Sequence, residues 1–135
     1  MDKFVSKVSR ANCSAESIYS RFENLEGVAN AVHHEKIEHV EASRDECHVT
    51  VKGMGTLGVR IVDREPFKTI KFTDIDGQPI SFTLWIQFVE VDSQDTRIRL
   101  TLHAEIPVLL RFMLKKKIQS GLDQAAEQIA STFSR

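Results

Sequence analysis

The sequence is poor in the residues that carry special covalent chemistry. Its 135 residues include only two cysteines, three prolines, one tryptophan and one tyrosine. The two cysteines, Cys13 and Cys47, allow one disulfide at most, which excludes a disulfide-rich secreted scaffold. The N-terminal residues have no apolar run of the signal-peptide type, and no run approaches the ~20 residues that span a bilayer. We therefore expect a cytoplasmic protein with reduced cysteines.

Neither sign of charge is in excess. Eighteen Lys and Arg residues face nineteen Asp and Glu residues, which gives a net charge of −1. Broad electrostatic binding of nucleic acid needs a basic excess or a basic face, so no nucleic-acid partner is expected. Hydrophobic residues make up 41% and charged residues 27%, as in ordinary folded domains. We expect residues 1–135 to form a single domain with its own core.

A short helical segment follows the N-terminal residues. Ser14 is a good N-cap, and Glu16 places a carboxylate in the first turn, where the helix dipole favours it. Apolar residues then recur at helical spacing as far as Leu25. Gly27 is expected to end or bend this helix, and residues 28–32 could form a second short one.

A much longer helix is predicted at the C-terminus. Pro107 suits the start of a helix because its missing N–H costs nothing there. The segment from Val108 to Phe133 carries an apolar stripe at helical spacing. A helix of that length spans about 39 Å, enough to cross a whole sheet.

The hydrophobic period changes to two between the helical segments. From Ile37 to Glu105 the side chains alternate between apolar and polar, most clearly from Ile80 to Phe88. Turn residues separate six such runs, and Phe4 to Arg10 is expected to form one further strand. One apolar and one polar face is typical of an antiparallel sheet covered on one side. The apolar stripe of the long helix is predicted to cover that face.

The hairpin around Ser93 and Gln94 is predicted to be irregular. A two-residue turn at these positions would pair Phe88 with Arg99 and put a charge on the core face. We therefore expect a β-bulge or a three-residue loop between Val89 and Asp95.

This order of elements resembles the helix-grip fold of the START-like superfamily, which includes polyketide cyclase/dehydrase and lipid-transport proteins. The resemblance covers nearly the whole chain and is carried by residues Phe4 to Val8, Ser14 to Phe22 and the amphipathic helix from Leu110 to Phe133. It implies an α+β fold in which a curved antiparallel sheet of about seven strands wraps a long C-terminal helix, with one or two short helices after the first strand. It also implies an elongated cavity for an apolar or amphipathic small molecule.

We accordingly expect the chain to bind a small hydrophobic or amphipathic molecule, such as a lipid, between sheet and helix. Transport of that molecule is an extension of the same hypothesis. Burial of apolar area would drive such binding. The candidate lining residues are Phe72, Phe82, Leu84, Leu100, Leu102, Met113 and Ile118, with Tyr19 as a polar anchor.

Little on the apolar face suggests catalysis. Cys47 is the only reactive group among the inward positions, and no base is placed beside it. No catalytic residue and no cofactor are expected, which favours a binding protein over an enzyme. Two alternatives stay open, an enzyme of the polyketide cyclase/dehydratase kind and an interaction module with a filled core. In the second case Trp85 or the polar face of the sheet would form the interaction surface, and an exposed Trp85 would mark a dimer contact.

Two other patterns indicate no cofactor or metal site. Residues 53–58 match GxGxxG, but a dinucleotide loop must open a helix, and a β-branched stretch follows here. A strand-to-strand turn is predicted instead. The five histidines are not placed to converge on one point, so no metal site is expected. They are His33, His34, His39, His48 and His103.

A basic cluster occupies the first half of the long helix. It consists of Arg111, Lys115, Lys116 and Lys117. Such a cluster is usually a solvated face. The alternative is a transient contact with anionic lipid head groups, worth up to ~1 kcal/mol per charge near a membrane surface. Stable insertion into a membrane is not expected.

Overall fold

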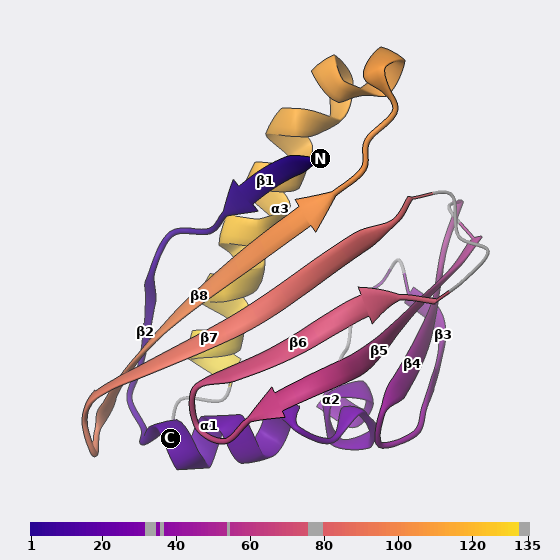
Figure 1. The fold of residues 1–135 in the computed structure, drawn as a ribbon. Coiled ribbons are helices and arrows are strands. Elements are labelled where there is room, and N and C mark those ends of the chain that lie inside the picture. The colour runs from indigo at the N-terminus through magenta and orange to yellow at the C-terminus, as the bar shows by residue number, and fades with distance from the viewer. Residues whose placement is uncertain (32–34, 36, 54, 76–79, 133–135) are drawn as a thin grey trace.

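A strongly curved antiparallel sheet and a long C-terminal helix dominate the computed structural model (Figure 1). The structure describes residues 1–31, 35, 37–53, 55–75 and 80–132. Over these residues the elements are β1 (Asp2–Val5), β2 (Ser9–Ala11), α1 (Ala15–Phe22), α2 (Leu25–Ala31), β3 (Ile37–Ala42), β4 (Glu46–Val51), β5 (Gly55–Glu65), β6 (Thr69–Asp74), β7 (Phe82–Asp92), β8 (Asp95–Ala104) and α3 (Val108–Thr132). The strand order is β1-β8-β7-β6-β5-β4-β3, with β2 also paired to β8. The α+β class and the helix-grip arrangement expected from the sequence are confirmed.

The N-terminal strand is divided, so the prediction of one strand from Phe4 to Arg10 is wrong. Val5 lies opposite Thr101 on β8, whereas Ser9 lies opposite Ile98, which leaves one extra residue in the N-terminal segment. Ser6 causes the break. Its backbone N–H donates to the Leu100 carbonyl at 2.8 Å, and its hydroxyl accepts from the Leu100 N–H at 2.8 Å. A side chain thus replaces a carbonyl in the ladder, and β2 starts in a shifted register.

Helix α1 begins as predicted, but its end differs. The Ser14 hydroxyl accepts a hydrogen bond from the Ser17 N–H at 3.1 Å and caps the helix. The helix ends at Phe22, before Gly27, and α2 contains Gly27 within it. The side chain of Asn24 starts α2 by accepting from the Glu26 N–H at 3.0 Å. The expectation that Gly27 would interrupt the helix is therefore wrong, because a second cap acts earlier in the chain.

The bulge predicted in the β7–β8 hairpin is confirmed. The register shifts between Glu90 and Asp92. Phe88 consequently lies opposite Ile98, which is completely buried, and no charged residue enters the core face at this position.

Helix α3 covers one side of the sheet rather than its whole width. It packs along β2, β8 and β1, while α2 packs against β3 and β4 (Figure 1). Its first turns extend past the ends of these strands. The expectation that its apolar stripe would be buried along its full length is wrong for these turns, and Phe133 lies outside the described residues. Within the described part of the chain, none of the helices combines the length and apolar character needed to cross a membrane.

Candidate functional site

The inner face of the sheet is sealed near α1 and open at its other end. The inward side chains of Ile70, Ile86 and Leu100 lie opposite one another on β6, β7 and β8, and at most 4% of each is exposed. Two residues further along these strands, Leu84 and Leu102 form the next cross-strand pair and are only half-buried. The apolar surface is therefore incompletely covered toward the start of β7.

Helix α3 shows the same change in burial along its length. Leu122, Ala126 and Ala130 in its second half are buried, whereas Leu114 and Ile118 are half-buried. Because β8 and α3 are joined by a short loop and run in opposite directions, the first half of α3 accompanies the end of β8. We call the half-buried set on the two surfaces the open apolar end; it consists of Phe82, Leu84, Leu102, Leu114 and Ile118.

The residues predicted to line the cavity fall into three groups. Phe82, Leu84, Leu102 and Ile118 belong to the open apolar end. Phe72 and Leu100 lie next to them on the sheet but are buried. Tyr19 and Met113 lie apart from this set: Tyr19 is packed at the sealed end, and Met113 is 67% exposed on the first turns of α3. Leu114 was not among the predicted lining residues, although it shares the helical stripe with Ile118.

Tyr19 is enclosed by aromatic rings instead of facing the open apolar end. Its ring meets Phe67 and Phe88 edge-on, at centroid distances of 5.5 and 6.1 Å. Phe88 is six residues from Phe82 along β7, about 20 Å in an extended strand. Burial, and then the nearby Glu23 carboxylate, raise the pKa of the Tyr19 hydroxyl above its ordinary 10.0. Tyr19 is thus placed to support the sealed end of the core.

Titration of the single tyrosine tests this placement. The ultraviolet absorbance of tyrosinate should give a midpoint above 10.0 in the folded protein and near 10 in denaturant. Folding then favours the protonated phenol, so its contribution to stability is complete below pH ~10 and is lost as the pH rises through the folded pKa. A midpoint at or below that of the unfolded chain would contradict the burial of Tyr19.

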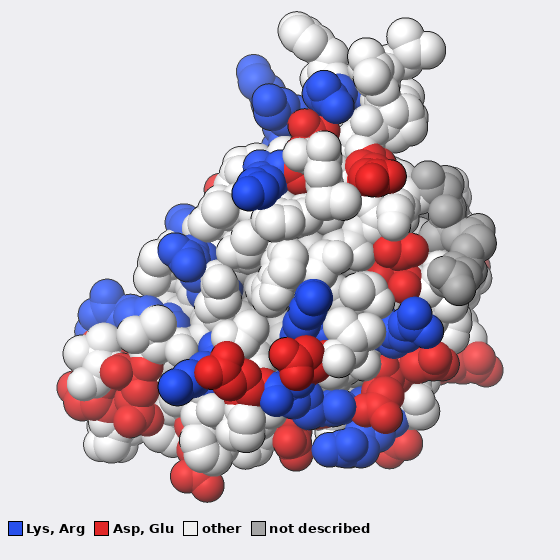
Figure 2. All heavy atoms as spheres, viewed as in Figure 1, with Lys and Arg blue, Asp and Glu red and all other residues white. Residues whose placement is uncertain are grey.

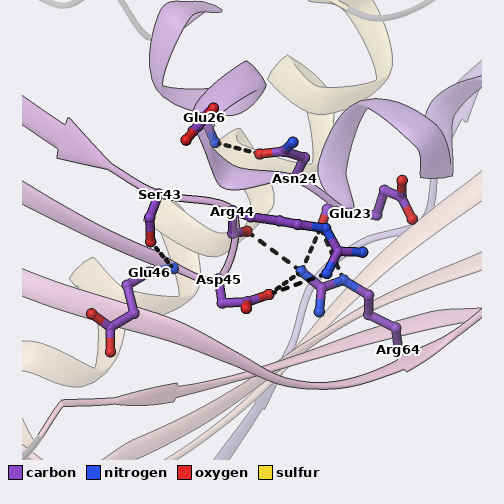
Figure 3. A network of polar contacts seen from close by, with 8 residues as sticks. All are labelled: Glu23, Asn24, Glu26, Ser43, Arg44, Asp45, Glu46 and Arg64. Carbon is purple, nitrogen blue, oxygen red and sulfur yellow. Dashed lines mark hydrogen bonds and ion pairs between the residues drawn. The ribbon is translucent and has the colours of Figure 1, made fainter.

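An arginine network ties α1 and α2 to the sheet at the sealed end (Figure 3). Arg64 on β5 donates from two nitrogens to the Glu23 carbonyl, at 2.9 and 2.6 Å, just after α1. The same guanidinium reaches the Asp45 carboxylate at 2.7 Å, in the β3–β4 turn. The Arg44 carbonyl in that turn accepts from the Leu25 N–H of α2 at 3.0 Å. Two of the three guanidinium nitrogens, Nε and Nη2, are thus engaged at the sealed end.

A carboxylate lies beside the open apolar end, on the connection between β6 and β7. Asp74, at the end of β6, accepts hydrogen bonds from the Phe82 N–H at 2.8 Å and the Ser81 hydroxyl at 3.3 Å. Its carboxylate therefore serves the β6–β7 connection. Cys47 is buried, and burial raises the pKa of its thiol, which disfavours the nucleophilic thiolate. The described surface is suited to apolar contact more than to acid–base or nucleophilic chemistry.

The histidines and glycines occupy structural positions where they are described. The Gly-rich turn has positive φ at Gly53 and Gly55 and leads into β5, so it joins two strands as predicted. The His39 side chain lies 3.3 Å from Glu41, and the His103 ring meets Trp85 edge-on at 4.7 Å. Over the described residues, no three His, Cys, Asp or Glu side chains are grouped so as to hold a metal ion. His33 and His34 lie outside the described residues.

Trp85 lies on the outer face, as its parity predicts, but it is half-buried. Its indole contacts the His103 ring, and the Lys71 ammonium lies over it at 5.6 Å from the centroid. These neighbours are its cross-strand surroundings on β6 and β8. Local contacts thus account for the position of Trp85.

Among the surface hollows that the described residues line, two with apolar side chains at their walls were not foreseen from the sequence. One of about 720 Å³ lies between the start of α1, the β5–β6 turn and the outer side of β7, and includes Phe67. Phe67 adopts a left-handed backbone conformation, φ 65°, and is 43% exposed. The other, of about 630 Å³, lies between β1 and the first half of α3. Both depend on how separate elements meet, and periodicity within one element gives no signal for that.

The fold of this chain matches solved structures closely, although the sequences differ. No protein-family model matches the chain, and no curated protein matches its sequence. A norcoclaurine synthase point mutant from Thalictrum flavum, in complex with a transition-state analogue, superposes with a TM-score of 0.74 at 16% identity, over 98% of this chain and 92% of that one. Protein CV1439 from Chromobacterium violaceum gives 0.69 at 13% identity, over 100% and 99%. The protein XoxI from Bacillus cereus gives 0.68 at 13%, over 97% and 96%. These likenesses establish the fold.

Proposed function

We propose that this chain binds a small hydrophobic molecule at the open apolar end and belongs to the ligand-binding or carrier group of START-like proteins. The observation that carries the proposal is the unequal burial of one continuous apolar surface. Leu84 and Leu102 on the sheet and Ile118 on α3 retain solvent exposure, while the same surface is fully buried near α1. Apolar side chains facing water in such a place gain free energy when a ligand covers them.

The available driving force is adequate for a small ligand. At about 25 cal/mol per Å², covering roughly 300 Å² of combined apolar surface contributes about 7.5 kcal/mol before the costs of association. Specificity would come from shape, because the Asp74 carboxylate beside Phe82 already accepts hydrogen bonds from a backbone N–H and a hydroxyl. A predominantly apolar ligand with few polar atoms therefore fits best.

A structural neighbour supports the choice of a small molecule. One structure of norcoclaurine synthase from Thalictrum flavum contains dopamine and hydroxybenzaldehyde, and it superposes with a TM-score of 0.73 at 14% identity, over 98% of this chain and 85% of that one. That protein is an enzyme by name. In the present chain the described side chains that form the open apolar end are all apolar, which favours binding without chemistry.

The test begins with native mass spectrometry of freshly purified protein, followed by extraction of any bound molecule. A recurring apolar metabolite or lipid is expected, and adding it back to stripped protein should raise the melting temperature. Protein that purifies without ligand, and gains no thermal stability across a panel of fatty acids, sterols and aromatic compounds, would contradict the proposal.

A pair of variants locates the site. Leu84→Trp puts a large side chain where the ligand should lie. We expect the apparent affinity for the ligand, obtained from the ligand-induced stabilisation, to fall at least tenfold. Val89→Trp is the matched control, because Val89 is on the same strand but 63% exposed on the other parity. Equal effects of both variants, or none from Leu84→Trp, would place the ligand elsewhere.

A further inference from the structure

The first turns of α3 present an apolar surface to solvent. Exposed fractions are 77% for Val108, 91% for Leu109, 96% for Phe112 and 67% for Met113. We call these four residues the α3 tip. They recur at spacings of one and four residues, so they share one side of the helix. This side extends past the sheet, and the rest of the fold does not cover it (Figure 1).

Positive charge surrounds the α3 tip. No Asp or Glu occurs between Glu105 and Asp123, whereas this stretch holds one arginine and three consecutive lysines, Lys115 to Lys117. Arg111 is paired with Asp2 on β1 at 3.0 Å, and the three lysines are exposed. Figure 2 shows several Lys and Arg side chains, with Asp and Glu side chains among them, at the base of the projecting part of α3, and uncharged side chains at its end. In a chain of net charge −1, this is a local concentration of positive charge.

The adjoining hollow has the same chemistry. Its lining combines apolar side chains from β1 and the α3 tip with four cationic ones, in a volume of about 630 Å³. The lining residues are Lys3, Phe4, Val108, Arg111, Phe112, Lys115, Lys116 and Gln119. A hollow lined by both apolar and cationic side chains matches an amphipathic anion, because the acyl part of such a molecule is apolar and its head group is negative.

We propose that the α3 tip docks on the surface of an anionic lipid bilayer. Leu109 and Phe112 enter the boundary between head groups and acyl chains, and the lysines contact the lipid phosphates. Leu109 precedes Lys116 by seven residues, about 10 Å along the axis, so the apolar residues lead and the lysines remain at the head groups.

The other candidate partner for the α3 tip is a second copy of the chain, and charge favours the bilayer over it. An isologous dimer would bury the apolar side chains of the α3 tip, but residues 106–122 of a facing copy hold no Asp or Glu to pair with the lysines. An anionic bilayer satisfies the apolar and the charged parts of the surface together. The proposal does not depend on ligand binding, since it concerns the opposite side of the helix from Leu114 and Ile118.

Vesicle co-sedimentation of the full chain tests the proposal. Binding is expected to vesicles that mix phosphatidylcholine with phosphatidylserine, and to weaken strongly as salt is raised. Binding to pure phosphatidylcholine should be at least tenfold weaker. No binding to the anionic vesicles, or equal binding to both kinds, would overturn the proposal. So would a dimer in light scattering that Phe112→Ser converts to monomer.

Two pairs of variants separate the apolar and electrostatic contributions. Leu109→Ser with Phe112→Ser should reduce vesicle binding at least tenfold, whereas the control Val89→Ser with Val91→Ser, at residues 63% and 59% exposed, should leave it unchanged. Lys116→Glu with Lys117→Glu should reduce it at least about 20-fold. The matched control for charge is Lys52→Glu with Arg60→Glu, at exposed positions in the turn after β4 and on β5. If a control pair lowers binding as much as its test pair, the α3 tip is not the docking surface.

Discussion

Replacement of Ile98 by alanine is expected to lower the free energy of unfolding by about 3–4 kcal/mol. Ile98 is completely buried at the sealed end, and it lies opposite Phe88 on β7 and Ser9 on β2. Truncation removes three carbons from a site enclosed on all sides, so the loss of transfer free energy is joined by the cost of a cavity. Urea or guanidinium unfolding, followed by circular dichroism, measures the change.

Leu102→Ala is the matched control for Ile98→Ala. Leu102 lies on the same strand and the same face, four residues away, but it is half-buried at the open apolar end. Because solvent can occupy the volume that truncation frees, the expected loss is only about 1–1.5 kcal/mol. A loss as large as that of Ile98→Ala would show that this end is as tightly closed as the other, and would remove the basis for a binding site there.

The alternation of apolar and polar residues was sufficient to predict the sheet and its inner face. Alternation fixes which side chains point inward, and an unpaired charge among them is costly, so even the bulge before Asp95 followed from pairing rules. Ile86 and Leu100, which are buried on neighbouring strands of the sheet, belong to that pattern.

The position of α3 could not be predicted in the same way. Helical periodicity identifies the apolar side of a helix but not how much sheet lies beneath it. Strand β8 ends at Ala104, so the helix that begins at Val108 starts beyond the end of this strand. The exposure of Phe112 and Met113 is a consequence of chain connectivity, and no local sequence pattern predicts it.

The burial of Arg64 could not be predicted from the sequence either, because it depends on how two strands pair. Strict alternation from Ile61 would place residue 64 on the outer face. The register shifts between Ile61 and Asp63, and Arg64 therefore lies opposite the buried Ile70 on the inner face. A one-residue irregularity thus brings a guanidinium to the end of α1, where unpaired carbonyls need donors.

Arg64→Ala should consequently be among the most damaging polar substitutions, with an expected loss of about 2–3 kcal/mol in the free energy of unfolding. It removes the donors to the Glu23 carbonyl and the Asp45 carboxylate, and the arginine side chain is only 20% exposed. Arg64→Lys should recover part of the loss, because one ammonium cannot reproduce the planar fork. Arg44→Ala is the control: its side chain is 58% exposed and 3.8 Å from the same carboxylate, so a loss below about 0.5 kcal/mol is expected. If both alanine variants unfold at the same denaturant concentration, the arginine network does not hold α1 and α2 to the sheet, and the sealed end must owe its stability to apolar packing alone.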